Sequence, residues 1–152
     1  MPALSASNES GPLRRFVRLS LRDQLRLVAL ALLLPLIDRK LRRGGLREAQ
    51  AWLARWQGHA TPRACTSADL ADAEQLARLA NIAGRRGFYA NTCLRQSLAV
   101  HWWLHRRGLR PQLRIGAQAS DGALDAHAWV ELDGTPLAQS RELPPVFARL
   151  RD

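Results

Sequence analysis

The sequence predicts an α+β fold in which a helical first half packs against a small antiparallel sheet from the second half. Apolar residues recur every three to four positions through much of the first half, which is typical of helices. Two short segments after Pro111 alternate apolar and polar residues, and Asp133-Gly134, a strong hairpin signal, follows the second one. Helices that precede the strands, rather than alternate with them, favour the α+β class.

The spacing of Leu and Val predicts a first helix from about 14 to 37. These residues occupy positions 13, 17, 21, 25, 28 and 32. The apolar run 27–37 is shorter than the ~20 residues that span a bilayer, so we interpret it as the buried part of this helix and expect no membrane span. Pro35 should kink or end the helix, and Gly44-Gly45 should break the chain.

Two further helices are expected before position 88. One covers roughly 46–56, and its predicted inward face consists of Leu46, Ala49, Trp52, Leu53 and Trp56. The other begins at a cap, either Thr66 or Ser67, and runs to about Ile82. Its inward residues should be Leu70, Ala73, Leu76, Leu79 and Ala80.

The second half predicts one more helix and then the sheet. The helix covers 92–107 and is closed by Gly108. Strands are expected at 112–117 and 126–132, with a turn at 120–122 between them. The hairpin at Asp133-Gly134 should lead into a returning strand over 135–139.

The length and composition of the chain limit its possible domain organisation. The chain has 152 residues and is 47% hydrophobic, which excludes disorder along its whole length. We expect a flexible tail over 1–12 and a single domain over 13–152, with a helical part to 88 and a catalytic helix and sheet from 89. Two cysteines do not make a disulfide framework, and no cleavage site follows the apolar run, so a reduced cytoplasmic protein is expected.

The formal net charge of +10 favours an anionic partner, such as a nucleic acid, a membrane surface or an acidic peptide. Nearly all the basic residues are Arg, interleaved with apolar residues in the first helix or clustered after it. Such charges can also form a solvated helix face. We expect peptide and protein partners and no nucleic acid.

Two segments carry candidate catalytic residues. Cys93 follows Asn91 and Thr92, either of which could cap the predicted helix and place the thiol in its first turn. A helix N-terminus favours the thiolate anion, and its free N–H groups can stabilise an oxyanion. His127 lies on the strand that precedes the hairpin, and an imidazole there could take up the thiol proton.

Residues of these types in such positions also have structural roles. A Cys at a helix start is often a small buried hydrophobe, and a His on a strand is often held by structural hydrogen bonds. His101 and His105 are four residues apart, but Trp102 stands where zinc proteases need Glu, so no metal is expected. Cys65 should be a spectator, and no cofactor is predicted.

Several consecutive segments resemble the B proteins of lasso-peptide biosynthesis, which are transglutaminase-like cysteine proteases. They are Cys93–Ala99, Leu104–Leu109, Leu113–Gly116 and Ala126–Gly134, in this order. The segment AHAWVE followed by DG is the most specific part.

The resemblance implies a protease that removes the leader from a ribosomally made precursor peptide. A partner cyclase, similar to asparagine synthetase, would then join the new N-terminal amine to an acidic side chain. A small recognition element binds the leader in this family. The helical first half has no strands for a fused recognition element, so the chain resembles the stand-alone form of the protease.

The family triad is Cys-His-Asp, and the position that matches its Asp is Gln139. Pairing across the Asp133-Gly134 turn would put Gln139 opposite Ala128 and Ser140 opposite His127. An amide can orient an imidazole but cannot stabilise the imidazolium as a carboxylate does. Glu142 and Asp125 are alternative third members.

Two other functions remain open from the sequence: acyl or amide transfer by the same residues, and a non-enzymatic basic helical binding module. We also consider that the helices from 14 to 56 dock the recognition element or the cyclase. The alternative is that they only cover the back of the catalytic core.

Overall fold

The computed structural model describes residues 16–85, 92–120, 123–139, 143 and 146–149, so the expected tail 1–12 lies outside it. The fold is α+β, as predicted. Its elements are α2 (Leu21–Ala54), α3 (Ser67–Arg85), α4 (Thr92–His105), β1 (Gln112–Ser120), β2 (Ala123–Leu132), β3 (Thr135–Pro136) and β4 (Val146–Arg149).

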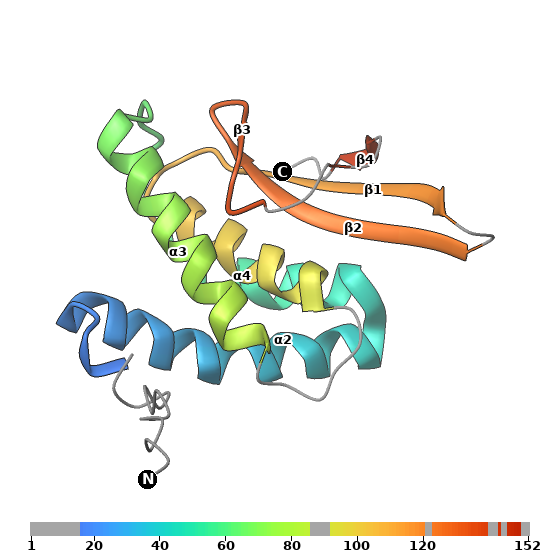
Figure 1. Ribbon diagram of the computed structural model, residues 1–152, viewed down its shortest axis with the longest axis horizontal. Helices are drawn as coiled ribbons and strands as arrows, with labels where there is room; N and C mark the ends of the chain where they lie inside the picture. Colours follow the sequence, from blue (N-terminus) through green and yellow to red (C-terminus); the bar gives the residue numbers. More distant parts are fainter. Residues whose placement is uncertain (1–15, 86–91, 121–122, 140–142, 144–145, 150–152) are drawn as a thin grey trace, which may run out of the picture.

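Helix α4 lies at the centre of the arrangement. Figure 1 shows the sheet on one side of α4 and the long first part of α2 on the other, with α3 crossing beside α4. The core is formed by the facing sides of the three helices and the sheet, and its largest fully buried side chains include Leu30, Leu76, Leu104 and Leu113. The start of α4 is therefore held between a helical layer and a sheet.

Helix α2 differs from the prediction at its start and at Pro35. It begins at Leu21, where the Ser20 hydroxyl accepts a hydrogen bond from the Asp23 N–H (3.1 Å), a cap that the apolar spacing did not reveal. Pro35 lies inside the helix and does not end it. Proline has no N–H to bond the Ala31 carbonyl, but Ala31 and Pro35 are both exposed, so water can bond this carbonyl instead. The break comes at Gly45, as expected, with φ 69° and ψ −162°.

The apolar run 27–37 is buried along one side only. Leu30, Leu34 and Ile37 are in the core, but Val28, Leu32 and Leu36 are exposed. The expectation that this run is the buried part of the helix is therefore correct for the side that faces the core and wrong for the opposite side, which no described element covers. Trp56, placed inward by its spacing, is also exposed.

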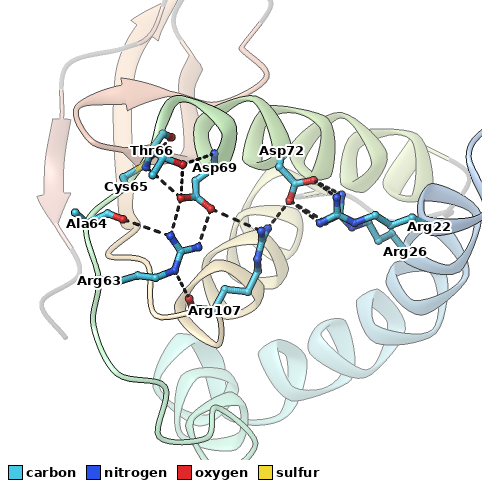
Figure 2. A network of polar contacts seen from close by, with 9 residues as sticks. All are labelled: Arg22, Arg26, Arg63, Ala64, Cys65, Thr66, Asp69, Asp72 and Arg107. Carbon is cyan, nitrogen blue, oxygen red and sulfur yellow. Dashed lines mark hydrogen bonds and ion pairs between the residues drawn. The ribbon is translucent and has the colours of Figure 1, made fainter.

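Helix α3 matches its predicted inward face and carries a network of charges. Thr66 is its cap: its hydroxyl accepts from the Asp69 N–H (3.2 Å), and Asp69 accepts from Thr66 in return. Figure 2 shows Asp69 facing Arg63, and Asp72 facing Arg22 and Arg26 from α2, with Arg107 between the two carboxylates. The network ties α2, α3 and the end of α4 together.

The sheet has the strand order β3-β2-β1-β4 and is antiparallel throughout. Strands β1 and β2 form a longer hairpin than predicted and pair from Gln112 opposite Glu131 to Ser120 opposite Ala123. Asp133 and Gly134 have φ of 51° and 75°, which is the conformation that a tight hairpin turn requires. The short edge strand β4 was not predicted.

The returning strand is shorter than expected. Strand β3 ends at Pro136, and although the Leu137 N–H still donates to the Val130 carbonyl (2.9 Å), Ala138 turns the chain away with φ 51°. The predicted pairing of Gln139 opposite Ala128 therefore does not form. Pro136 has no N–H to donate, and this favours an early end to the strand.

Candidate active site

A pocket of about 390 Å³ opens where the start of α4 meets β2 and the segment after β3. Its walls include Cys93, His127 and Gln139, the three residues singled out from the sequence. The pocket also takes in Asn81 and Arg85 from α3. The fold thus brings together residues that are far apart in the chain.

Cys93 is the second residue of α4 and is a free, partly buried thiol. Its helix is anchored to the sheet, because the buried Ser97 hydroxyl one turn later donates to the Ala128 carbonyl on β2 (3.0 Å). Backbone N–H groups in the first turn of a helix have no partner within the helix. Cys93 therefore stands beside groups that can bind a developing negative charge.

His127 lies on β2 opposite Gly116 of β1, which has no side chain to crowd the imidazole. Its Nε2 is 2.8 Å from Gln139 Oε1. The Gln139 amide nitrogen donates to the Leu137 carbonyl (2.7 Å), so the amide oxygen faces the ring and accepts a hydrogen bond from the Nε2–H group. Because Nε2 carries the proton, Nδ1 is left with the lone pair.

One face of the imidazole is stacked on the Trp129 indole, with ring centroids 5.9 Å apart and an interplanar angle of 18°. Trp129 is buried, and its indole N–H donates to Glu131 (3.1 Å), which in turn accepts from Arg114 Nε of β1 (2.8 Å). The chain of contacts fixes the plane of the His127 ring. A fixed ring is what a proton-transfer group needs.

Two hydrogen bonds with α3 hold the segment that carries Gln139. The Ala138 N–H donates to the Glu74 carboxylate (2.7 Å), and the Asn81 amide donates to the Ala138 carbonyl (3.3 Å). These two contacts hold Ala138 in its left-handed conformation and so aim Gln139 at His127. Gln139 thus reaches the ring from an anchored loop and not from a strand.

Sequence reasoning missed the contribution of α3. Glu74, Asn81 and Arg85 are spaced by seven and four residues, so they share one face of the helix. Polar residues at this helical spacing were a visible signal, although α3 carries other charged residues as well, such as Asp72 and Arg78. Nothing in the sequence said that the loop after β3 would lie against it.

Cys65 lies apart from the pocket, and the side chains of the other two candidates lie outside the described part of the chain. Cys65 precedes α3 and is a free thiol; partial burial, and then the Asp69 carboxylate, raise its pKa and keep it protonated. Asp125 pairs through its backbone with Gln118, and Glu142 lies outside the described residues. No cluster of potential metal ligands occurs within the described ranges, and none of the helices there could cross a bilayer.

Comparison with known protein families places this arrangement. A family model described as the transglutaminase-like superfamily matches residues 25–152, which run from near the start of α2 through β4 and include Cys93, His127 and Gln139. No curated protein and no solved structure matches the chain. This superfamily is typically built on a Cys-His-Asp catalytic fold, which supports a cysteine enzyme in general. The chain belongs to the transglutaminase-like superfamily.

Proposed function

We propose that this protein is a cysteine peptidase that removes the leader from a ribosomally made lasso-peptide precursor. The observation that carries the proposal is the shared pocket, in which Cys93 at a helix start faces the same space as His127, itself held by Gln139. The leader as substrate rests on the sequence resemblance over 93–134. The reaction class rests on the pocket.

In the first step the Cys93 sulfur attacks the carbonyl carbon of the leader–core peptide bond. The thiol proton passes to His127 Nδ1, because the bond to Gln139 occupies Nε2. Backbone N–H groups near the start of α4 bind the oxyanion that forms. His127 then gives its proton to the departing amine, the C–N bond breaks, and the leader remains as a thioester on Cys93.

In the second step water attacks the thioester. His127 accepts a proton from this water, the C–S bond breaks, and the thiol recovers its proton. The products are the free leader acid and a core peptide with a new N-terminal amine. A neutral Gln139 fixes the ring tautomer in both steps, but offers less stabilisation to the imidazolium than a carboxylate would.

The partners that this function requires are the precursor leader, a separate leader-recognition element and an asparagine-synthetase-like cyclase. The new amine is the group that a cyclase would join to an acidic side chain of the core. No cofactor or metal is needed for hydrolysis through a thioester.

The test is processing of a lasso precursor by the purified protein together with the recognition element, with leader and core detected by mass spectrometry. Cys93→Ala and His127→Ala should each abolish cleavage while circular dichroism and the melting temperature stay close to those of the parent. Cys65→Ser is the matched control and should keep most activity. Full cleavage by Cys93→Ala would refute the proposal.

The same residues could pass the acyl group to an amine in place of water, as the superfamily description suggests. Adding methylamine distinguishes these outcomes. Release of the free acid alone supports the peptidase, whereas an N-methylamide with no free acid would assign the transferase. A thiol alkylator applied to Cys65→Ser should stop either reaction, and would leave a pure binding module unaffected.

A further inference from the structure

Helix α2 carries a long stripe of apolar side chains that face solvent. Its members are Leu21, Leu25, Val28, Leu32 and Leu36, each between 48% and 73% exposed. They are spaced by three or four residues and so lie on one face of the helix, over about 22 Å at 1.5 Å per residue. A contiguous apolar surface of this length is typical of an interaction site. We call these five residues the α2 stripe.

An apolar groove runs beside the C-terminal half of the stripe. It has a volume of about 710 Å³. Leu32 and Leu36 line one side, and the other side consists of Trp102 and Trp103 from α4 and Arg106, which directly follows α4. The Trp102 indole is fixed by a hydrogen bond to the Leu53 carbonyl (3.0 Å), and Arg106 lies over its ring at 4.9 Å. A groove with fixed walls suits inserted side chains, whereas a flat bilayer surface would leave it unfilled.

Positive charge marks both ends of the α2 stripe. Arg39 and Arg43 continue its spacing toward the C-terminus, are exposed, and pair with no carboxylate among the described residues. Arg18 is exposed at the other end; its neighbour Arg22 is also exposed but already pairs with Asp72 (3.1 Å). A second copy of this chain would place Arg against Arg in either orientation, and each copy has a net charge of +10. The charges therefore disfavour self-association through this face.

We propose that the α2 stripe and the adjoining groove bind an acidic protein partner. The partner segment presents apolar side chains at helical spacing, with carboxylates at both ends to meet Arg18 at one end and Arg39 and Arg43 at the other. Among the described residues, the groove and the catalytic pocket share no lining side chain, and the sheet and the first part of α2 lie on different sides of α4 (Figure 1). A docked partner would thus leave Cys93 open to substrate.

The probe for the test is the separate leader-recognition protein, a choice that rests on the proposed function. Its affinity for the full-length chain is measured by titration calorimetry. Leu25→Glu with Leu32→Glu should weaken binding at least about tenfold, because apolar anchors at the centre of an interface contribute most of its energy. The control Ile82→Glu changes an apolar side chain that is 44% exposed on α3 and should bind like the parent.

The charged ends are tested separately. Arg39→Glu with Arg43→Glu should weaken binding at low salt and reduce its dependence on ionic strength, since exposed charge pairs are screened. Arg110→Glu, at an exposed position between α4 and β1, is the control for net charge. No binding by the parent, or equal binding by the stripe variants and the parent, overturns the proposal.

Two further experiments test whether the α2 stripe binds a membrane or a second copy of the chain instead. A positive result in either one overturns the proposal. Flotation with phosphatidylcholine–phosphatidylglycerol vesicles would show stripe-dependent membrane binding. Sedimentation would show a dimer that the stripe variants dissociate. The peptidase function fails independently: stripe-dependent binding without precursor cleavage refutes the function alone, whereas cleavage unaffected by the stripe variants refutes the docking surface alone.

Discussion

The two nitrogens of the His127 ring have different surroundings, and this difference defines the chemistry of the residue. Nε2 is bonded to Gln139, whose own amide nitrogen is bonded to the Leu137 carbonyl, so the side chain cannot rotate without losing one contact. A neutral acceptor of this kind fixes the tautomer of the ring. It adds little electrostatic stabilisation when the ring becomes charged.

Gln139→Ala is therefore expected to lower kcat/KM for leader removal about tenfold, the value of one partly buried hydrogen bond, and much less than loss of Cys93 or His127. Gln139→Asp restores the residue type of the family triad and should raise the rate above that of Gln139→Ala. Steady-state kinetics on the precursor measure both. A variant Gln139→Ala as inactive as His127→Ala would show that Gln139 does more than orient the ring.

At the residue scale, chemistry allowed Cys93 and His127 to be found from the sequence, since a helix start and a strand beside a tight turn are both readable. Gln139 was reached by counting across the hairpin, but the strand on which the count relied ends at Pro136. The contact with His127 depends on Ala138, a residue with positive φ that no local pattern predicts. Their catalytic roles stay predictions.

At the element scale, α3 acts as the support of the loop that carries Gln139. Glu74 accepts from the Ala138 N–H and also pairs with Arg78 one turn later (3.2 Å). The two contacts can be separated by mutation. Only the first bears on the pocket.

Glu74→Ala should displace the loop and lower kcat/KM about tenfold, because it removes a charge-assisted hydrogen bond to a strained residue. Glu74→Gln keeps an acceptor oxygen and should recover most of the rate, which a merely stabilising role would not predict. Arg78→Ala is the matched control: it removes the same exposed ion pair and leaves Ala138 held. Loss of activity in Arg78→Ala would contradict this assignment.

Elements with strong local signals were predictable, and those set by tertiary contacts were not. A cap at Thr66 or Ser67 and a break at Gly44-Gly45 follow from residue type alone, and the structure has Thr66 as the cap and Gly45 as the break. Strand β4 forms by pairing with the free edge of β1, and a segment of four residues is too short to show a strand pattern in the sequence. Apolar spacing indicates that α2 is a helix but not how much of its circumference is covered.

At the scale of the whole molecule, one network of charges connects the helical layers. Arg26 is buried and binds Asp72 through both nitrogens (2.8 and 2.7 Å), while Arg107 contacts the same carboxylate (Figure 2). The hydrogen bond from Arg26 lowers the pKa of Asp72 to about 2, against the opposing effect of burial and with the help of Arg107. The Arg63 guanidinium and Thr66 hold the pKa of Asp69 well below its usual range.

A carboxyl whose pKa is lower in the folded state stabilises the fold above its unfolded pKa, and this contribution is lost as the pH falls toward the folded value. The free energy of unfolding should therefore fall between about pH 4 and pH 2, with roughly 2 kcal/mol of the loss due to Asp72. Urea titrations across this range measure it. Asp72→Asn should unfold more easily at pH 7 by about 3 kcal/mol, since buried Arg26 loses its two short charge-assisted bonds and keeps the longer contact with Asp23 (3.6 Å).

Arg78→Ala again provides the control, because its exposed pair should contribute less than about 1 kcal/mol. The pH dependence of Asp72→Asn should be flatter than that of the parent in the same window. A parent protein equally stable at pH 2 and pH 7 would show that these carboxylates are not important for stability.

Because His127 is stacked on Trp129, protonation of this base should be detectable by tryptophan fluorescence. An imidazolium in contact with an indole quenches its fluorescence, whereas a neutral imidazole quenches it far less. Emission should therefore fall as His127 takes up a proton, on a background from the other four of the five Trp residues. The pH-dependent step should vanish in Trp129→Phe and in His127→Ala. The molecule thus contains its own optical probe of the group that we expect to carry the proton.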